Sequence, residues 1–145
     1  MLKLLRPALV ASAIGLTLAA APAFAATEKF TADLTAAAVG ATDTSTATGA
    51  ATITYNTTTK VLTWTITYKG LTGKANGAHF HGPAAAGASA PPEVALKGSL
   101  KSPIKGHATL TTKEASDLEA GMLYLNIHTA KYPDGEIRGQ VEKAQ

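Results

Sequence analysis

The stretch KVLTWTITYKG (residues 60–70) alternates large apolar side chains with threonines and lysine. Because successive side chains of a β-strand point to opposite faces, it predicts a strand that is buried on one face only. The buried face would carry Leu62, Trp64, Ile66 and Tyr68. Residues 51–55 alternate in the same way, and NTTT (residues 56–59) separates the two runs. The sequence therefore predicts a β-hairpin here.

A second hairpin is predicted near the end of the chain. Leu123, Leu125 and Ile127 alternate with more polar residues, the turn YPDG (132–135) follows, and EIRGQVE (136–142) returns. Pro and Gly favour a turn at this point. Weaker strands are expected over residues 29–35, 77–81, 93–100 and 107–111.

One short helix is expected after Thr111, since Thr111 and Glu114 have the spacing of a capping box. Residues 82–92 (GPAAAGASAPP) and 39–49 have the composition of loops. Short strands separated by turns indicate an antiparallel β-sandwich or barrel.

The first 25 residues have the features of a secretory signal peptide. Lys3 and Arg6 precede an uncharged apolar run, and Ala23-Phe24-Ala25 is a signal-peptidase pattern. The alternative, a membrane anchor, is disfavoured because the run is short and lacks flanking charges. We expect residues 26–145 to form a single exported domain, periplasmic or secreted, with no membrane insertion after cleavage.

Composition excludes several classes of protein. Of 13 basic residues, two leave with the signal peptide, so 11 face 10 acidic residues and the net charge is +1. With no polybasic run, nothing indicates a nucleic acid partner. The absence of cysteine excludes disulfides, thiol catalysis and cysteine zinc sites. No Gly-x-Ser-x-Gly motif, carboxylate cluster or phosphate-binding loop is present.

Two of the four histidines lie in AHFHGPA (residues 78–84). In a strand His79 and His81 project from one face, while Ala78 and Phe80 point to the core. Such a pair can form half of a copper or zinc site. His128 is the best third ligand, because it lies on the polar face of its strand. The alternative is that the histidines bond backbone carbonyls and hold the loop at Gly82.

Two further expectations concern neighbouring residues. We expect His81 to face out, so that its loss would cost metal affinity but little stability. The side chain of His107 is expected on the outward face of its strand, but nothing in the sequence places it near His79 and His81. Arg138 is the only arginine left after cleavage. It could bind or steer an anion, and the favoured alternative is a bidentate pair with Glu136 or Asp134.

Three blocks in this order resemble the CHRD domain, a family named from chordin and found in exported bacterial proteins. They comprise Ala78, His79, His81, Gly82 and Pro83; then Gly121, Tyr124, Asn126, His128 and Thr129; and then Pro133, Gly135, Glu136, Arg138, Gly139 and Gln140. The resemblance extends from Phe30 to Val141 and implies an immunoglobulin-like β-sandwich. Residues 38–43 depart from the family's Glu-x-Pro-Pro pattern. The fold expected is thus an all-β antiparallel immunoglobulin-like β-sandwich or Greek-key barrel with one short helix.

A weaker likeness is to the site of copper–zinc superoxide dismutases. His79, His81, His128 and Arg138 follow the order of that site, although the chain lacks the cysteines and the zinc loop. Three hypotheses are left open. The first is an exported metal-binding protein, with copper favoured over zinc. The second is a structural or protein-interaction module with no metal and an unknown protein partner, and the third is a copper-dependent, superoxide dismutase-like redox enzyme. A non-enzymatic role is favoured. The sequence leaves the oligomeric state open.

Overall fold

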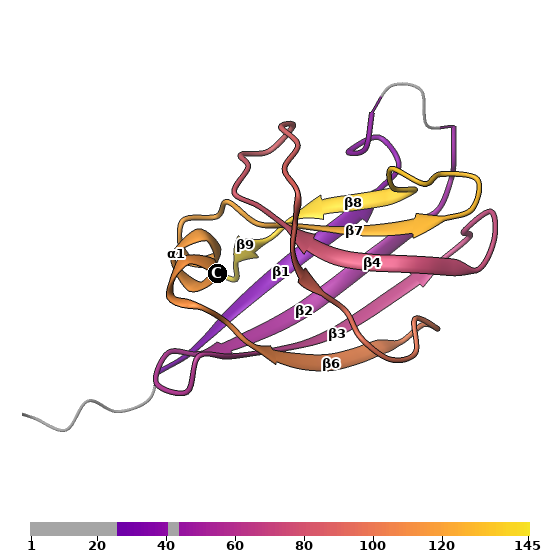
Figure 1. The fold of residues 1–145 in the computed structure, drawn as a ribbon. Helices are drawn as coiled ribbons and strands as arrows, with labels where there is room; N and C mark the ends of the chain where they lie inside the picture. The colour runs from indigo at the N-terminus through magenta and orange to yellow at the C-terminus, as the bar shows by residue number, and fades with distance from the viewer. Residues whose placement is uncertain (1–25, 41–43) are drawn as a thin grey trace, which may run out of the picture.

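The computed structural model describes residues 26–40 and 44–145. The expected signal peptide and residues 41–43 lie outside these ranges. The strands are β1 (Thr27–Thr35), β2 (Thr48–Asn56), β3 (Val61–Lys69), β4 (Ala75–His81), β5 (Pro92–Ala95), β6 (Ile104–Thr109), β7 (Tyr124–Thr129), β8 (Ile137–Gln140) and β9 (Glu142–Lys143), and α1 is Thr112–Glu119 (Figure 1). No helix within these ranges has the length and hydropathy required to cross a bilayer.

The hairpin predicted from the first stretch is β2–β3. Its register places Ile53 opposite Trp64, and the predicted inward residues of β3 are buried, with Tyr68 only partly so. The side chain of Asn56 accepts hydrogen bonds from the backbone N–H groups of Thr58 and Thr59. The turn is thereby fixed by a local side-chain contact, as expected for an Asn that begins a turn.

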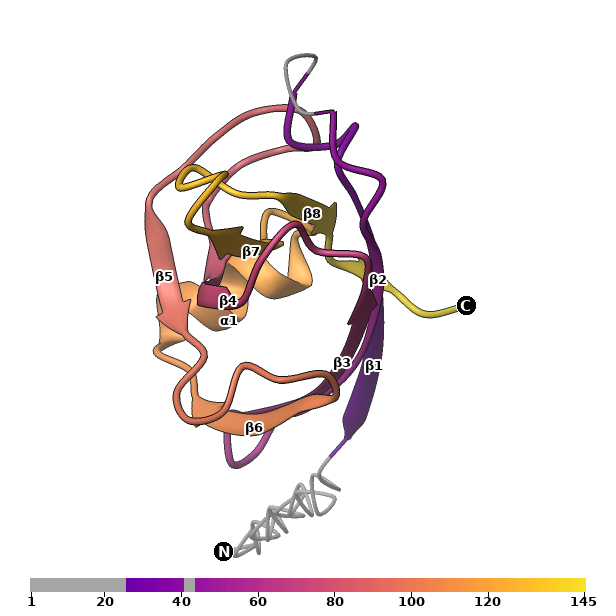
Figure 2. The ribbon, with the colours of Figure 1, turned by 90° about the vertical axis from the view of Figure 1, so that its right-hand side faces the viewer.

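All strand pairs are antiparallel, and the sheet coils into a nearly closed barrel of eight strands, in the order β5-β4-β7-β8-β1-β2-β3-β6. Figure 2 shows the sheet curving around a central core. Across this core Trp64 of β3 and Phe80 of β4 meet edge to face, with ring centroids 5.5 Å apart. The predicted all-β antiparallel fold is confirmed, and its form is a single coiled sheet.

All four weaker strands are found, with bounds that differ from the expected ranges: β1 and β4 each begin two residues earlier, and β5 and β6 differ more. β5 ends at Ala95 instead of residue 100, and Gly98 follows with φ +91°, which turns the chain. β6 begins at Ile104 and ends at Thr109, because Thr111 caps the helix. The capping box of Thr111 and Glu114 is confirmed in both directions. Figure 1 shows α1 at one end of the barrel, where Leu118 is buried.

Strand β8 is tightly packed against β1 at Gly139. A Cβ atom there would lie 2.2 Å from the carbonyl oxygen of Asp33. Replacing Gly139 by alanine is therefore expected to lower the free energy of unfolding by about 2–3 kcal/mol, a typical cost of overpacking. Urea unfolding followed by the fluorescence of Trp64, the only tryptophan, would measure it. Gly73→Ala is the control, since nothing lies within 4 Å of a Cβ there. Equal midpoints for both variants would contradict the expectation.

Candidate metal centre

The side chains of His79, His81 and His128 come together on the outer face of β4 and β7. The strands β4 and β7 are neighbours, and His128 of β7 pairs with Gly77 of β4. Gly77 precedes His79 by two residues, so the side chain of His79 lies close to that of His128. Ala78 and Phe80 point into the core as predicted. Because Gly77 has no side chain, the rings of His79 and His128 can lie over it: a Cβ there would be 3.4 Å from His79 and 3.5 Å from His128.

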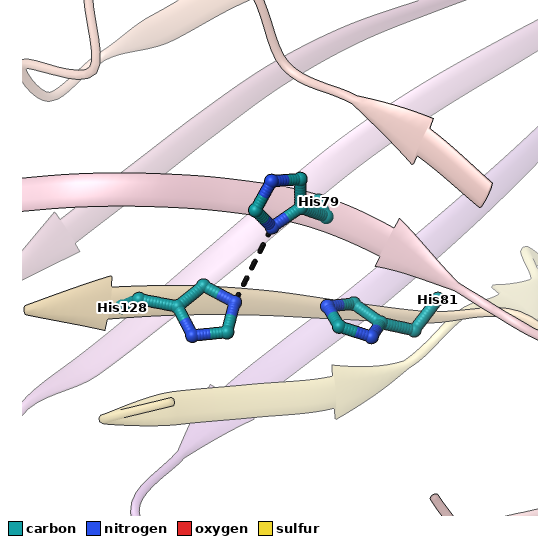
Figure 3. A group of neighbouring side chains, drawn as sticks. All are labelled: His79, His81 and His128. Atoms are coloured by element: carbon teal, nitrogen blue, oxygen red, sulfur yellow. Dashed lines mark hydrogen bonds between the residues drawn. The ribbon is translucent and has the colours of Figure 1, made fainter. Parts of the chain in front are cut away.

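The three imidazoles converge (Figure 3). Nδ1 of His79 lies 3.3 Å from Nε2 of His128, and one ligand nitrogen from each histidine falls within 4.8 Å of the others. Two nitrogens bound at 2.0–2.1 Å to one tetrahedral ion are roughly 3.3–3.4 Å apart. The closer pair already has this spacing, whereas a separation of 4.8 Å is wider than two such bonds can span, so a ring must rotate before all three nitrogens bind one ion.

Backbone carbonyls fix the protonation of two of the rings. Nδ1 of His81 lies 3.0 Å from the oxygen of Ala90, and Nδ1 of His128 lies 2.9 Å from that of Pro133. Since a carbonyl oxygen only accepts, each Nδ1 carries the proton, and in the neutral ring each Nε2 presents a lone pair. Nε2 of His81 is buried and has no hydrogen-bond partner. Metal-binding histidines have this arrangement, because their second nitrogen usually donates to a carbonyl or carboxylate.

The surroundings of His79 and His81 favour the neutral form of both rings. Burial lowers the pKa of His79, and the neighbouring His128 and His81 lower it further. Burial also lowers the pKa of His81. The hydrogen bond to Ala90 raises this pKa, but the nearby His128 and Arg138 lower it, and the net shift is downward. A neutral imidazole is the form that binds a metal ion.

The loop of residues 82–91 covers this face of the sheet, and residues of β7 and β8 hold it. The hydroxyl of Tyr124 donates to the oxygen of Ala90 at 3.0 Å. Arg138 donates to the oxygen of Ala88 at 2.8 Å, and Gln140 to that of Ala84 at 2.9 Å. The outer face of β7 and β8 is therefore largely buried, which the sequence did not predict.

His81 lies beneath this loop. Only 7% of its surface is exposed, and its ring stacks on that of Tyr124, with centroids 4.9 Å apart. The expectation that His81 is exposed is therefore wrong, and the reason for expecting little loss of stability on its removal no longer holds. It does point away from the core, but the loop covers it.

Arg138 does not form the predicted ion pair. Its guanidinium carbon lies 3.5 Å from the centre of the Tyr124 ring, a cation–π contact. β4 and β8 flank β7 on opposite sides, so His81 and Arg138 reach Tyr124 from opposite strands. Glu136 is bonded instead by Ser45, Thr72 and Thr129. The predicted pair with Glu136 or Asp134 is therefore wrong in the described structure.

His107 lies outside the cluster. It is exposed on β6, opposite Thr63 of β3. Within residues 26–40 and 44–145, one group of histidine and acidic side chains could hold a metal ion, and it consists of His79, His81 and His128.

Sequence reasoning found the three histidines and missed their surroundings. Gly77 and Tyr124 were not recognised as parts of the site, whereas the alternative that a histidine bonds a backbone carbonyl of the loop after Gly82 matches the bond between His81 and Ala90. One signal was present in the loop: residues 82–92 carry no charge, which suits a segment that lies on other parts of the protein.

Comparison with known proteins identifies the family. The family model described as the CHRD domain matches residues 30–141. No curated protein and no solved structure matches the chain, and the likeness to superoxide dismutases finds no support. The match spans more than half of the chain and includes the three blocks around the histidines. The chain belongs to the CHRD domain family.

Proposed function

We propose that this CHRD domain is an exported module that binds one transition metal ion through His79, His81 and His128. The observation that carries the proposal is the protonation pattern of the rings. His81 and His128 donate from Nδ1 to backbone carbonyls, so in the neutral form of each ring Nε2 carries no proton, and Nε2 of His128 lies 3.3 Å from Nδ1 of His79. A buried, unpartnered Nε2 on His81 is costly, and a bound ion would satisfy it.

Copper is the metal we propose first, with zinc as the alternative. Three imidazoles and no carboxylate form the set, and imidazole ligands suit both copper and zinc. Among divalent ions, copper has the higher intrinsic affinity for such ligands. Export to the periplasm or beyond the cell is part of the proposal, and it rests on the signal-peptide pattern of residues 1–25.

The second candidate is a structural or protein-interaction module that binds no metal. The observation in its favour is that Tyr124, Arg138 and Gln140, which belong to the family blocks, all bond the 82–91 loop. These residues need no metal to explain them. The histidines would then serve only to hold the same loop and the turn at Pro133.

Copper titration of the untagged protein without its first 25 residues separates the two candidates. We expect one copper ion per chain by calorimetry and elemental analysis, and no stoichiometric binding after His79, His81 and His128 are all replaced by alanine. That variant retains His107, so any weak surface binding remains as a background. A wild-type protein that binds no stoichiometric copper or zinc would contradict the metal-binding function and support the second candidate.

A further inference from the structure

A cavity of about 580 Å³ lies at the barrel end where β3 finishes and β4 begins. Tyr68 and Leu100 contribute apolar walls, while Lys74, Asn76, Ser99 and Lys101 contribute polar groups. Its volume falls within the roughly 300–1,000 Å³ typical of sites for small molecules. None of the three clustered histidines lines it, so it is separate from the candidate metal centre.

The loop that forms one wall of this cavity is fixed to β3. The hydroxyl of Tyr68 donates to the oxygen of Leu100 at 2.7 Å, and the N–H of Tyr68 donates to the hydroxyl of Ser102 at 3.0 Å. Binding sites of this kind are usually formed before the ligand arrives. These two bonds hold the wall in place without a ligand.

The charge around the cavity is positive. No acidic residue lines it, and the chain has no Asp or Glu in residues 44–92 or in residues 94–113. The ion pairs of the described residues involve other lysines, namely Lys113 with Glu93 and Asp117, and Lys143 with Glu28. Lys74 and Lys101 are therefore exposed cations without an acidic partner in the described structure.

We propose that this cavity binds a small organic anion, a carboxylate carried on an apolar or aromatic body. The body lies against Tyr68 and Leu100. The carboxylate lies between Lys74 and Lys101, whose ammonium groups form charge-assisted hydrogen bonds with it. Asn76 and Ser99 supply further hydrogen-bonding groups that fix its orientation. This proposal does not depend on the binding of a metal.

The test is an NMR titration of the isotope-labelled protein with 2-naphthoate, and with neutral 2-naphthamide for comparison. Naphthoate should produce saturable shifts of the amide signals of Asn76 and of residues 98–101, and naphthamide should produce none. Replacing Lys74 and Lys101 together by glutamine should weaken binding by about tenfold or more, because both charged partners are lost. The lysines are exposed, so the variant should fold, and its spectrum would confirm this.

Replacing Lys29 and Lys105 together by glutamine is the matched control. Both lysines are exposed and neither lines the cavity, so this variant loses the same two positive charges. It should bind naphthoate within about twofold of the wild type, because exposed charges outside the site have little effect. An equal loss in this variant would show attraction to the whole basic surface and overturn the proposal. Absence of saturable shifts, or equal binding of the neutral amide, would overturn it as well.

Discussion

Replacing His128 by alanine is expected to weaken copper(II) binding by about a hundredfold or more and to leave the stability of the metal-free domain nearly unchanged. Changes to residues that merely orient a ligand typically cost 10–100-fold in metal affinity, and this change removes a ligand itself. The remaining pair, His79 and His81, would bind copper with two nitrogens instead of three. Competition calorimetry against a chelator of known affinity would measure the difference.

Little loss of stability is expected, because the side chain of His128 is only partly buried and its polar and ring contacts are with the turn and with the other two histidines. Its Nδ1 bonds the oxygen of Pro133 in an exposed turn, and its ring faces that of His79 at a centroid distance of 5.2 Å. Thermal unfolding in the presence of a chelator would check this. The two measurements together separate a role as a ligand from a role in holding the turn, since the latter would lower stability and leave affinity intact.

His107→Ala is the matched control. This residue is the one histidine outside the cluster, and it is exposed on β6. Its variant should bind copper as the wild type does. If His107→Ala weakened binding as much as His128→Ala, or if His128→Ala kept wild-type affinity, the three-histidine site would be wrong.

The period-two pattern was sufficient to predict the main strands. In β3 each predicted inward residue lies on the core side, because a strand with one apolar face has only one register that buries it. The same argument placed His79 and His81 on one face of β4 and His128 on the polar face of β7. The triad could therefore be predicted from parity and the order of the motifs.

The same parity could not predict what covers the outer face. Arg138 lies on the polar side of β8, opposite Asn126 of β7, and Glu136 directly precedes that strand, but both side chains are buried, at 5% and 0% exposed. Their partners come from segments distant in sequence, Ala88 for Arg138 and Ser45, Thr72 and Thr129 for Glu136. Short-range patterns do not contain such contacts, which is why the expected pairing of these two residues was wrong.

Closure of the sheet also depends on long-range contacts. The sequence allowed either two packed sheets or a barrel, because inward and outward residues alternate along the strands of both architectures. The order β4-β7-β8-β1 joins the first and second halves of the chain into one sheet. Trp64 and Phe80 then meet in the interior, although 15 residues separate them.

Replacing Glu136 by alanine is expected to lower the free energy of unfolding by about 4 kcal/mol. The carboxylate is fully buried and accepts four hydrogen bonds: from the hydroxyl of Ser45 at 2.7 Å, from the N–H and the hydroxyl of Thr72 at 2.8 and 3.0 Å, and from the hydroxyl of Thr129 at 2.7 Å. Among the donors the hydroxyl of Thr129 is buried, and hydrogen bonds to a charged group contribute about 1.5–3 kcal/mol each, so the loss of this carboxylate is costly. Chemical unfolding at pH 7 would measure the loss.

Two variants serve as controls for this loss. Glu136→Gln keeps the volume and one acceptor oxygen, and the hydroxyls of Thr72 and Thr129 can rotate to accept from its amide. It should therefore be clearly more stable than Glu136→Ala. Glu142→Ala removes an exposed carboxylate from β9 and should change stability by less than about 0.5 kcal/mol. If Glu136→Ala were as stable as Glu142→Ala, the hydrogen bonds to Glu136 would contribute nothing net.

The pH dependence of stability gives an independent measure of the same network. Burial alone would raise the pKa of Glu136, but the hydrogen bonds from Ser45, Thr129 and Thr72 outweigh it, and the pKa is lowered from its ordinary value of 4.5. A carboxyl group with a lower pKa in the folded state stabilises the fold above its ordinary pKa, and this contribution is lost as the pH falls through the folded-state value. The wild type should therefore lose stability more steeply than Glu136→Ala below about pH 4.5. Parallel curves for the two proteins, followed by urea unfolding between pH 7 and pH 3, would show that Glu136 does not titrate differently in the folded and unfolded chains.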